Sequence, residues 1–320
     1  MKLLTSTALS AALLVPALAT AESLTFAWTP NPQTPQVDIA IEKGYFEDAG
    51  LDIEFVSFPT GREGFEAMIG GQVDVTFMAE FPAAVGALTG QDFAVVGDLA
   101  RFTGSRVIVN TASGEVAGPS DLAGKRIGTT IGTNVNFYLD EILSGAGIEA
   151  EVVGAAPPDL VPALARGDLD AIVPFPTFYG AAKTTLGDSY AELRVPGYDV
   201  HYILAATPEM TGEKSATLDA FMAALAKADA DVQADPEAAM AAVARSMQGA
   251  MTPEALAQMW QDVDIGLKLD EGLAELLVRE ADWILAQGVV RGEAVDTAAM
   301  LELFAPEALR KASPEAVSLP

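Results

Sequence analysis

Five places in the chain could hold a small ligand, and at each of them an expected strand ends and a helix begins. The indole of Trp28 could stack on a flat or aliphatic ligand, and the helix start beyond it offers free N–H groups near Asn31, Gln33 and Gln36. In Thr60-Gly61-Arg62, the glycine lets the backbone approach a ligand, and the guanidinium could clamp an anion with two hydrogen bonds. A core position for Trp28 and a solvated helix position for Arg62 are the alternatives.

Three further strand ends complete the candidate site. Gly132-Thr133-Asn134 precedes a helix whose N–H groups and dipole favour an anion, although the same residues would make an ordinary N-cap. Pro176 and Phe178 belong to an aromatic and proline cluster that could form an apolar wall or plug an interface between lobes. Glu80, directly before Phe81, could accept hydrogen bonds from an amine or an amino-heterocycle, or it could cap the next helix.

Three other titratable residues are weaker candidates. His201 could contact a ligand, but it is more often a satisfied hinge or core residue at a crossing between lobes. Asp74 and Asp170 stand at the start of their strands, opposite the ligand edge. We interpret these two aspartates as structural groups that bond to turn amides, and not as a catalytic pair.

Composition excludes several classes of chemistry. The 320 residues include no cysteine and one histidine, so thiol catalysis, thiolate or histidine metal clusters and a Ser-His-Asp triad are not expected. We predict no catalytic residue, no metal and no cofactor. The formal charge of −27 disfavours nucleic acid and anionic membranes as partners. It does not exclude an anionic small ligand, because local backbone dipoles can outweigh distant surface charge.

The first 21 residues are interpreted as a secretory signal peptide. Lys2 gives a positive start, Ala8 to Leu18 is an apolar segment too short to span a bilayer, and Ala19-Thr20-Ala21 is a small-residue cleavage site. No cysteine stands there for lipid anchoring, and no later apolar run reaches membrane-spanning length without charges. The mature protein is expected to be soluble, exported to the periplasm after cleavage near Ala21, and monomeric.

The elements that position the candidate residues alternate between strand and helix, which predicts α/β lobes with mostly parallel sheets. The expected strands include Leu24–Trp28, Leu51–Phe55, Val73–Met78, Phe93–Val96, Ile127–Thr130, Glu151–Val153 and Ala171–Val173. The helix-to-strand turn at Gly70–Asp74 recurs at Gly167–Asp170, which suggests two lobes on one plan.

We predict that residues 22–110 and 203–320 form lobe 1 and that residues 111–202 form lobe 2. Arg106–Val109 leads out of the first lobe, and Tyr202–Ala206 is the expected return crossing. Two crossings would make a hinged, clam-like molecule. Long alanine-rich helices are expected around lobe 1, at Leu218–Gln233, Pro236–Gln248, Pro253–Val263 and Leu273–Gln287.

The run A-I-E-K-G-Y-F-E-D-A-G-L-D-I over Ala40–Ile53 resembles the A-x-E-K-G-[FY]-F…G-L-[DE]-V signature of a family of periplasmic substrate-binding proteins. This is the nitrate/sulfonate/taurine and thiamine-pyrimidine-precursor group. Gly71–Asp74, Asp121–Gly128 and Ala163–Ala171 are similar to its other blocks, in the same order. The resemblance implies the type II periplasmic-binding fold, with the solute between two lobes joined by a two-strand hinge. It also implies the membrane permease of an ABC transporter as a transient partner.

The branch of the family, and hence the solute, stays open. Trp28–Pro32 resembles the pyrimidine-precursor branch, whereas Phe58–Gly61 resembles the sulfonate and taurine branch more. A taurine-like zwitterion would place its anionic head at Thr133-Asn134 and its amine at Glu80, and a pyrimidine would stack on Trp28. A sensing module for a membrane receptor is an alternative to transport, and a periplasmic enzyme on the same fold is a weaker one.

Overall fold

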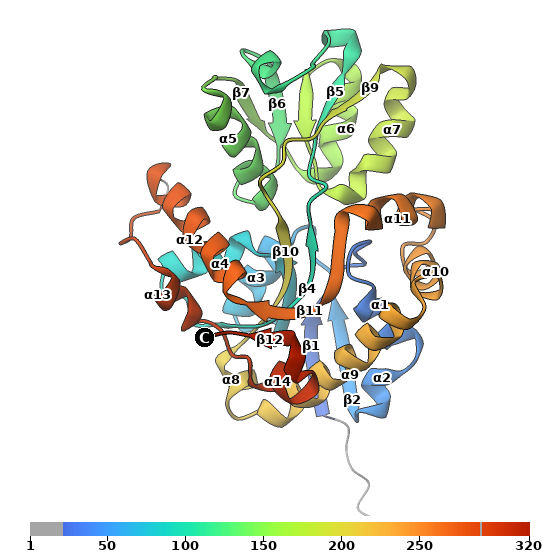
Figure 1. The fold of residues 1–320 in the computed structure, drawn as a ribbon, viewed down its shortest axis with the longest axis vertical. Helices are drawn as coiled ribbons and strands as arrows, with labels where there is room; N and C mark the ends of the chain where they lie inside the picture. The colour runs from blue at the N-terminus through green and yellow to red at the C-terminus, as the bar shows by residue number, and fades with distance from the viewer. Residues whose placement is uncertain (1–21, 289) are drawn as a thin grey trace, which may run out of the picture.

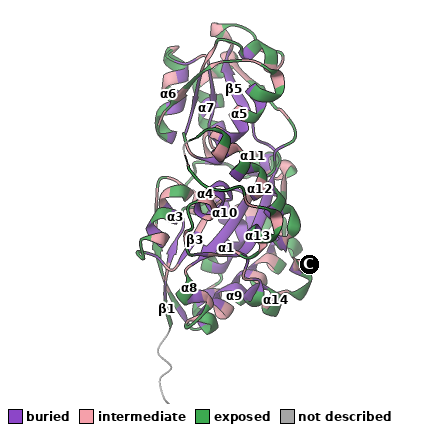
Figure 2. Cartoon of the chain, turned by 90° about the vertical axis from the view of Figure 1, so that its left-hand side faces the viewer, coloured by how far each residue is buried: buried purple, intermediate pink, exposed green. Residues whose placement is uncertain are grey.

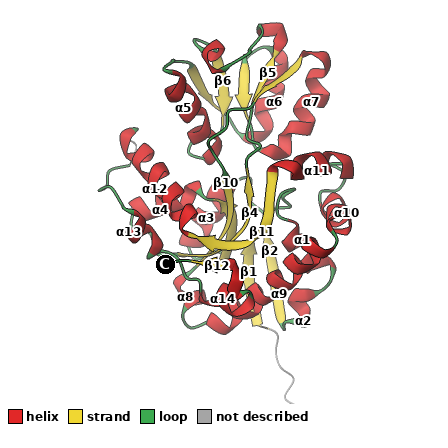
Figure 3. Ribbon diagram, in the orientation of Figure 1, coloured by secondary structure: helices red, strands yellow, loops and turns green. Residues whose placement is uncertain are grey.

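The computed structural model describes residues 22–288 and 290–320, so the predicted signal peptide lies outside the described residues. The described chain forms two β-sheets that follow one another along the long axis of the molecule, each flanked by helices (Figure 1; Figure 3). Buried residues gather on the strands and on the helix faces that meet them (Figure 2). The predicted α/β class is confirmed.

The first sheet is built by strands from both ends of the described chain. Its strands are β1 Glu22–Ala27, β2 Leu51–Val56, β3 Val75–Ala79, β4 Ala94–Phe102, β10 Val200–Ala206, β11 Val263–Asp270 and β12 Val317–Ser318. Within the described residues their order is β12-β11-β4-β10-β3-β1-β2. Strands β1, β2 and β3 are parallel, whereas β10 runs antiparallel between β3 and β4, and β11 runs antiparallel to β4.

The second sheet comes from one continuous segment. Its strands are β5 Val107–Asn110, β6 Arg126–Thr129, β7 Glu151–Gly154, β8 Ala171–Val173 and β9 Tyr190–Leu193. Their order in the described chain is β7-β6-β8-β5-β9, with β5 antiparallel to both of its neighbours. The expectation of mostly parallel sheets is therefore wrong. Strand β10 returns from the other sheet at the same end at which β4 leaves the first sheet. It therefore pairs antiparallel with β4.

The helices divide in the same way between the two sheets. Around the first sheet lie α1 Pro35–Glu42, α2 Tyr45–Asp48, α3 Gly61–Ile69, α4 Phe81–Leu88, α8 Pro208–Thr211, α9 Ser215–Ala234, α10 Pro236–Ser246, α11 Pro253–Met259, α12 Glu271–Ala286, α13 Thr297–Leu301 and α14 Glu307–Ala312. Around the second lie α5 Asn134–Ala146, α6 Pro157–Arg166 and α7 Tyr179–Leu186. We call the first sheet with its helices lobe 1 and the second sheet with its helices lobe 2 (Figure 1).

Two short segments join the lobes, residues 103–106 after β4 and residues 194–199 before β10. The hydroxyl of Tyr138, on α5, lies 2.9 Å from the carbonyl oxygen of Ser105 and 3.1 Å from that of Val195, so it ties both segments to lobe 2. At both crossings, the residues that pair within each sheet differ from the predicted lobe boundaries. Strand β5 pairs within the second sheet, and Val200 already pairs within the first, because the chain crosses before β5 and before β10.

The two aspartates of the repeated turn each fasten one strand to its neighbour. Asp74 Oδ2 accepts hydrogen bonds from the backbone N–H of Thr25 at 2.8 Å and from its hydroxyl at 2.7 Å. Asp170 Oδ2 accepts from the backbone N–H of Arg126 at 2.9 Å, and Oδ1 lies 3.1 Å from that guanidinium. The structural role predicted for both residues is confirmed, although their partners are strand amides and not turn amides.

Candidate functional site

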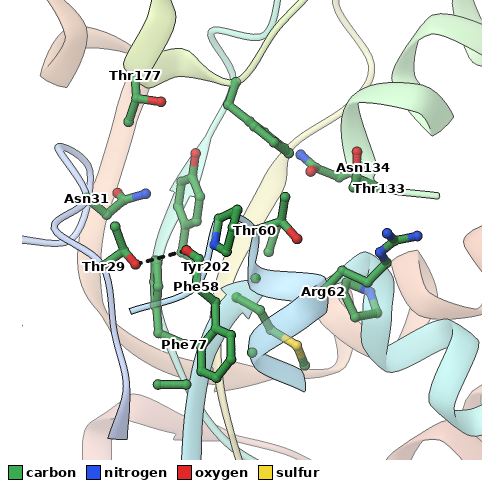
Figure 4. Close-up of a pocket in the computed structure, with 18 of the residues that line it drawn as sticks. Thr29, Asn31, Phe58, Thr60, Arg62, Phe77, Thr133, Asn134, Thr177 and Tyr202 are labelled. Carbon is green, nitrogen blue, oxygen red and sulfur yellow. Dashed lines mark hydrogen bonds between the residues drawn. The ribbon is translucent and has the colours of Figure 1, made fainter. Parts of the chain in front are cut away.

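A cavity of about 160 Å³ lies where strand ends of lobe 1 face strand ends of lobe 2. The carboxyl ends of β1, β2 and β3 open onto it from lobe 1, as expected for ligand sites in α/β sheets. The residues around this first cavity are Ala27, Trp28, Thr29, Pro30, Asn31, Phe58, Pro59, Thr60, Gly61, Arg62, Gly64, Phe77, Met78, Ala79, Pro82, Thr133, Asn134, Phe175, Pro176, Thr177, Phe178 and Tyr202. Figure 4 shows ten of them labelled.

Aromatic rings form the lobe 1 wall of the first cavity. The ring of Trp28 meets the ring of Phe77 edge to face, with centroids 4.8 Å apart, and stacks on Phe26 at 5.9 Å. Phe77 in turn stacks on Tyr202 at 5.9 Å. Trp28 is buried, so the two alternatives for this residue combine: it packs in the core and one part of it borders the cavity. Such a wall suits the apolar body of a ligand.

The start of α3 forms one polar edge of the cavity. The Thr60 hydroxyl accepts from the backbone N–H of Glu63 at 3.3 Å, and the Glu63 carboxylate accepts from the backbone N–H of Thr60 at 3.1 Å. This capping box fixes the first turn. A Cβ on Gly61 would lie 2.7 Å from the Cβ of Met78, so glycine is needed for the close approach of α3 to β3. The first turn therefore holds its backbone directly at the cavity edge.

Arg62 extends from this turn toward lobe 2. Its side chain is partly exposed, and its Nε lies 3.8 Å from the carboxylate of Glu66, a loose ion pair. Its NH1 would lie 3.1 Å from a Cβ placed on Gly132, so the guanidinium of one lobe rests against the backbone of the other (Figure 4). A guanidinium in this place can reach an anion between the lobes with two donors.

The start of α5 provides the opposite polar edge, from lobe 2. Asn134 begins this helix of 13 residues, and no described side chain caps its first turn. The Thr133 hydroxyl instead donates to the carbonyl oxygen of Thr130 at 2.7 Å. First-turn N–H groups of a helix are directed outward and carry its positive dipole end. Arg62 and the start of α5 together form a positive pole, well suited to a sulfonate, carboxylate or similar anion.

Carboxylates are absent from the described lining of the first cavity, although Glu66 pairs loosely with Arg62 from outside that lining. None of the described residues that line the first cavity is aspartate or glutamate, although the chain has 45 such residues. Within residues 22–288 and 290–320, no group of three or more histidine, aspartate or glutamate side chains is placed to hold a metal ion. No helix of the described chain is long and apolar enough to cross a membrane.

Several predicted residues do not border the first cavity. Phe81 and Gly132 line a second cavity next to it. Gln33 and Gln36 are fully buried, and Gln36 donates to the carbonyl oxygen of Leu99 at 2.9 Å and to Asp229 at 2.8 Å. Gln36 lies in the first turn of α1, which begins at Pro35, and Gln33 lies in the turn before that helix, where its N–H donates to Asn31 Oδ1 at 2.8 Å.

Glu80 and His201 are likewise turned away, although both stand at the expected strand edge. Glu80 Oε2 accepts from the backbone N–H of His201 at 2.8 Å, and Oε1 accepts from the hydroxyl of Tyr198. His201 Nδ1 lies 2.7 Å from Asp98 Oδ2. Glu80 therefore does not line the first cavity and its side chain does not cap α4, because Oε1 is bonded to the segment that joins the lobes and Oε2 to the backbone of β10.

Burial and neighbouring charges shift the pKa values of Glu80, Glu280 and His201. Burial raises the pKa of Glu80, although the Glu280 carboxyl and the Tyr198 hydroxyl act in the opposite direction. Burial, followed by the charge of Glu80, raises the pKa of Glu280 well above its ordinary value. Burial acts to lower the pKa of His201, but the hydrogen bond and charge of Asp98 outweigh it and raise that pKa. Two buried carboxyl groups in contact hold a shared proton more easily than two charges.

Sequence reasoning missed several residues that line the first cavity. Thr29 and Phe58 are each the second residue after a strand, β1 and β2, and the Thr29 hydroxyl donates to the carbonyl oxygen of Phe58 at 3.2 Å (Figure 4). The rule that strand ends carry the site would have found both. Phe77 and Tyr202 lie within β3 and β10, and only the pairing of these strands shows that both rings face the cavity.

Two α/β lobes with a ligand-sized cavity between their strand ends are the arrangement of the periplasmic-binding-protein fold. The chain belongs to the NMT1/THI5-like family, whose model matches residues 31–239. The taurine-binding periplasmic protein of Escherichia coli (strain K12) is 25% identical over 168 residues, which are 52% of each chain.

Solved structures show the same fold. The alkanesulfonate-binding protein SsuA from Xanthomonas axonopodis pv. citri, bound to MOPS, has a TM-score of 0.72 at 18% identity over 93% of this chain and 98% of that one. The desulfurization enzyme DSZB has a TM-score of 0.69 at 17% identity, with 92% and 99% covered. The chain spans about half to two thirds of the length of the first curated relatives it matches. Two of the curated relatives are named as binding proteins, for aliphatic sulfonates and for taurine, and a third is named as a thiamine biosynthesis protein.

Proposed function

We propose that this protein is an exported solute-binding protein that captures a small organic anion of the sulfonate type between its lobes and delivers it to an ABC importer. Relatives named for taurine and for aliphatic sulfonates support the class of solute. The predicted signal peptide, cleaved near Ala21, would supply export to the periplasm. The partner is then the membrane permease, met transiently by a monomer.

The observation that carries this proposal is the positive pole at the first cavity. A chain with a formal charge of −27 places one arginine and an uncapped helix start at the first cavity, and no carboxylate belongs to the described lining of that cavity. A random selection of surface groups from this chain would be strongly acidic. Exclusion of carboxylates removes like-charge repulsion and leaves the helix start free to donate to an anion.

The same positive pole distinguishes between the candidate solutes that the sequence left open. An ammonium group, as in taurine, finds no described carboxylate at the cavity to pair with, since Glu80 is buried in another network. An amino-pyrimidine would lack the same partner, although Trp28 could border its ring. We therefore propose a solute with one anionic head and an apolar body, such as an alkanesulfonate, in preference to a zwitterion or a base.

Closure of the two lobes would complete the site. Arg62 of lobe 1 already meets Gly132 of lobe 2, so an anion held at this point contacts both lobes at once. A ligand that binds both lobes favours the closed arrangement in proportion to its extra affinity for that state. The segments at residues 103–106 and 194–199 are the places where a hinge would act. The permease would then receive the closed, loaded protein.

A thermal-shift screen with ethanesulfonate, butanesulfonate, taurine, nitrate, an amino-pyrimidine and putrescine tests the proposal. A solute at 100 times its Kd should raise the free energy of unfolding by about 2.7 kcal/mol. We expect the alkanesulfonates to give the largest shift and putrescine none. Failure of every anion to shift the melting temperature would contradict the proposal. NMR spectra of the incubated solutes would also reveal turnover, the outcome that favours an enzyme.

Arg62→Gln tests the pole itself. Loss of a charge-assisted hydrogen bond costs about 1.5–3 kcal/mol, so the affinity for an alkanesulfonate should fall about 10-fold to 100-fold. Arg166→Gln is the matched control, because this exposed arginine at the end of α6 pairs only with Asp168 among the salt-bridge partners in the described chain. Equal losses in both variants would show a general charge effect and remove Arg62 from the site.

A further inference from the structure

A second and larger cavity, of about 670 Å³, lies on the other side of Arg62. Lobe 1 contributes helices α3, α4 and α12, and lobe 2 contributes the start of α5 and an end of β7. Its lining residues are Arg62, Phe65, Glu66, Ile69, Phe81, Pro82, Val85, Gly86, Thr89, Gln91, Ile131, Gly132, Asn136, Asp140, Val152, Trp283, Ile284, Gln287 and Val290. The cavity is thus built by both lobes, as the first one is.

The walls of the second cavity are mainly apolar, and part of this surface is open to solvent. Ile131 is 48% exposed and Val152 is 39% exposed, and both belong to lobe 2. Among the described residues, they are two of four large hydrophobic side chains with this degree of exposure. The other two, Ile41 and Phe55, line neither cavity. Exposed apolar side chains that gather in one hollow of a highly acidic protein indicate a site for an apolar group.

The positive pole stands at the boundary between the two cavities. Arg62 and Pro82 line both. The start of α5 is divided between them, with Thr133 and Asn134 at the first cavity and Gly132 and Asn136 at the second. An anionic head held at this pole can therefore direct its body into either cavity. The first offers about 160 Å³ and the second about 670 Å³.

We propose that the second cavity is a subsite for the apolar tail of a monoanionic amphiphile, whose head occupies the pole at Arg62 and the start of α5. This inference rests on the proposed function and narrows it to organic sulfonates or similar anions with a tail of about eight carbons or an aryl group. The second cavity is the larger of the two and is within the range of drug-sized ligand sites, so it offers such a tail more room than the first.

The charges around the second cavity restrict the tail to an uncharged one. Glu66 and Asp140 are its carboxylates, and Asp140 accepts a hydrogen bond from the indole N–H of Trp283 at 2.5 Å. A second negative group at the far end of the ligand would meet these carboxylates in a partly dehydrated hollow. Sulfonates with one charged end should therefore bind, and α,ω-disulfonates of the same length should not.

Tryptophan reporters can locate the tail. The chain has three tryptophans. Trp28 lines the first cavity, Trp283 lines the second, and Trp260 lines neither and donates to the carbonyl oxygen of Pro32 at 2.6 Å. In the full mature protein labelled with 5-fluorotryptophan, each should give a ¹⁹F resonance that single Trp→Phe variants assign. Octanesulfonate should shift the Trp283 resonance, and ethanesulfonate should leave it unchanged.

Calorimetric titration with alkanesulfonates of two to ten carbons measures the affinity gain. Each methylene buried in an apolar site should improve Kd about threefold to fourfold, so octanesulfonate, with four more methylenes, should bind about 80-fold to 250-fold more tightly than butanesulfonate. Affinity that stops rising beyond four carbons, with Trp283 unchanged by octanesulfonate, would overturn the subsite and leave the proposed function intact. No binding at any tail length would instead refute the proposed function.

Ile131→Glu and Ile41→Glu form a matched pair of variants. Both isoleucines are exposed, so neither change should unfold the protein, and each adds one negative charge. Ile131→Glu should weaken octanesulfonate at least 10-fold and ethanesulfonate less than twofold, because only the long tail would reach that wall. Ile41→Glu should leave both affinities unchanged. Equal losses for both solutes in Ile131→Glu, or equal losses for octanesulfonate in both variants, would overturn the inference.

Discussion

Replacement of Glu280 by glutamine should change how the stability of the protein depends on pH. Glu280 lies on α12, is fully buried, and has the Tyr198 hydroxyl 3.4 Å from Oε1, while Oε2 has no hydrogen-bond partner among the described residues. Glu80 faces it, and His201 and Tyr198 complete the polar groups in contact with Glu80. A carboxyl group in this setting is best accommodated with its proton on.

The sign of the effect follows from the raised pKa of Glu280. Above the ordinary carboxyl value of 4.5, the unfolded chain releases this proton whereas the folded protein keeps it. Folding then takes up a proton, so the wild-type protein loses stability as the pH rises, by about 1.4 kcal/mol per pH unit for one group. Glutamine has nearly the same shape and no proton to take up. The advantage of Glu280→Gln over the wild type should therefore grow by about 1.4 kcal/mol per pH unit while Glu280 stays protonated.

Urea unfolding followed by circular dichroism at pH 5, 6 and 7 measures this difference. Glu275→Gln is the control, because Glu275 lies on the same helix and is exposed, so its curve should run parallel to the wild type. The m-values should be unchanged, since neither variant alters the area exposed on unfolding. If the Glu280→Gln and wild-type stabilities run parallel from pH 5 to pH 7, Glu280 is not a protonated buried acid and the reasoning fails.

Three further variants test other parts of the structure. Asp38→Asn should flatten the fall in stability between pH 3.8 and about 7, because burial raises the pKa of Asp38 to about 7; a chevron series across that range checks it. Asp74→Ala should cost about 2–3 kcal/mol in urea unfolding at pH 7 by loss of two strand-fastening hydrogen bonds, and the exposed Asp52→Ala should cost under 0.5 kcal/mol. Gly61→Ala should weaken alkanesulfonate binding, since its Cβ would lie 2.7 Å from a Cβ of β3. Gly145→Ala, with no atom within 4 Å of the new Cβ, should leave calorimetric affinity unchanged.

The fold was predictable where the sequence pattern is local. Strand–helix alternation predicted both α/β lobes, and the repeated glycine–aspartate turn located two equivalent strands. Strand β11 was also within reach: in the run V-D-I-G-L-K-L-D over Val263–Asp270, every second residue is apolar. The expected helix over Pro253–Val263 included only its first residue, and residues 264–272 were assigned no element. The helix ends at Met259, and an alternation of two residues should have outweighed the expectation of another long helix.

The direction of a strand within its sheet, and the side on which its side chains lie, could not be predicted from a local sequence pattern. The antiparallel entry of β10 depends on where the chain returns from lobe 2, and no spacing within β10 records that. The same pairing brings Tyr202 beside Phe77 and so creates the aromatic wall of the first cavity. Residues in the loop and first helical turn after a strand, such as Thr60 and Arg62, were found because their position alone places them at the ligand edge.

Glu80 shows that a position at the carboxyl end of a strand does not by itself make a residue line the cavity. It directly follows β3, yet Oε1 bonds to Tyr198 in the segment that joins the lobes and Oε2 bonds to the backbone N–H of His201 in β10. A carboxylate at the positive pole would compete with an anionic solute, whereas the same group turned toward Tyr198 links the end of β3 to a crossing between the lobes. The acid that the sequence assigns to ligand choice thereby lies where it can act on lobe arrangement, and no carboxylate belongs to the described lining of the first cavity.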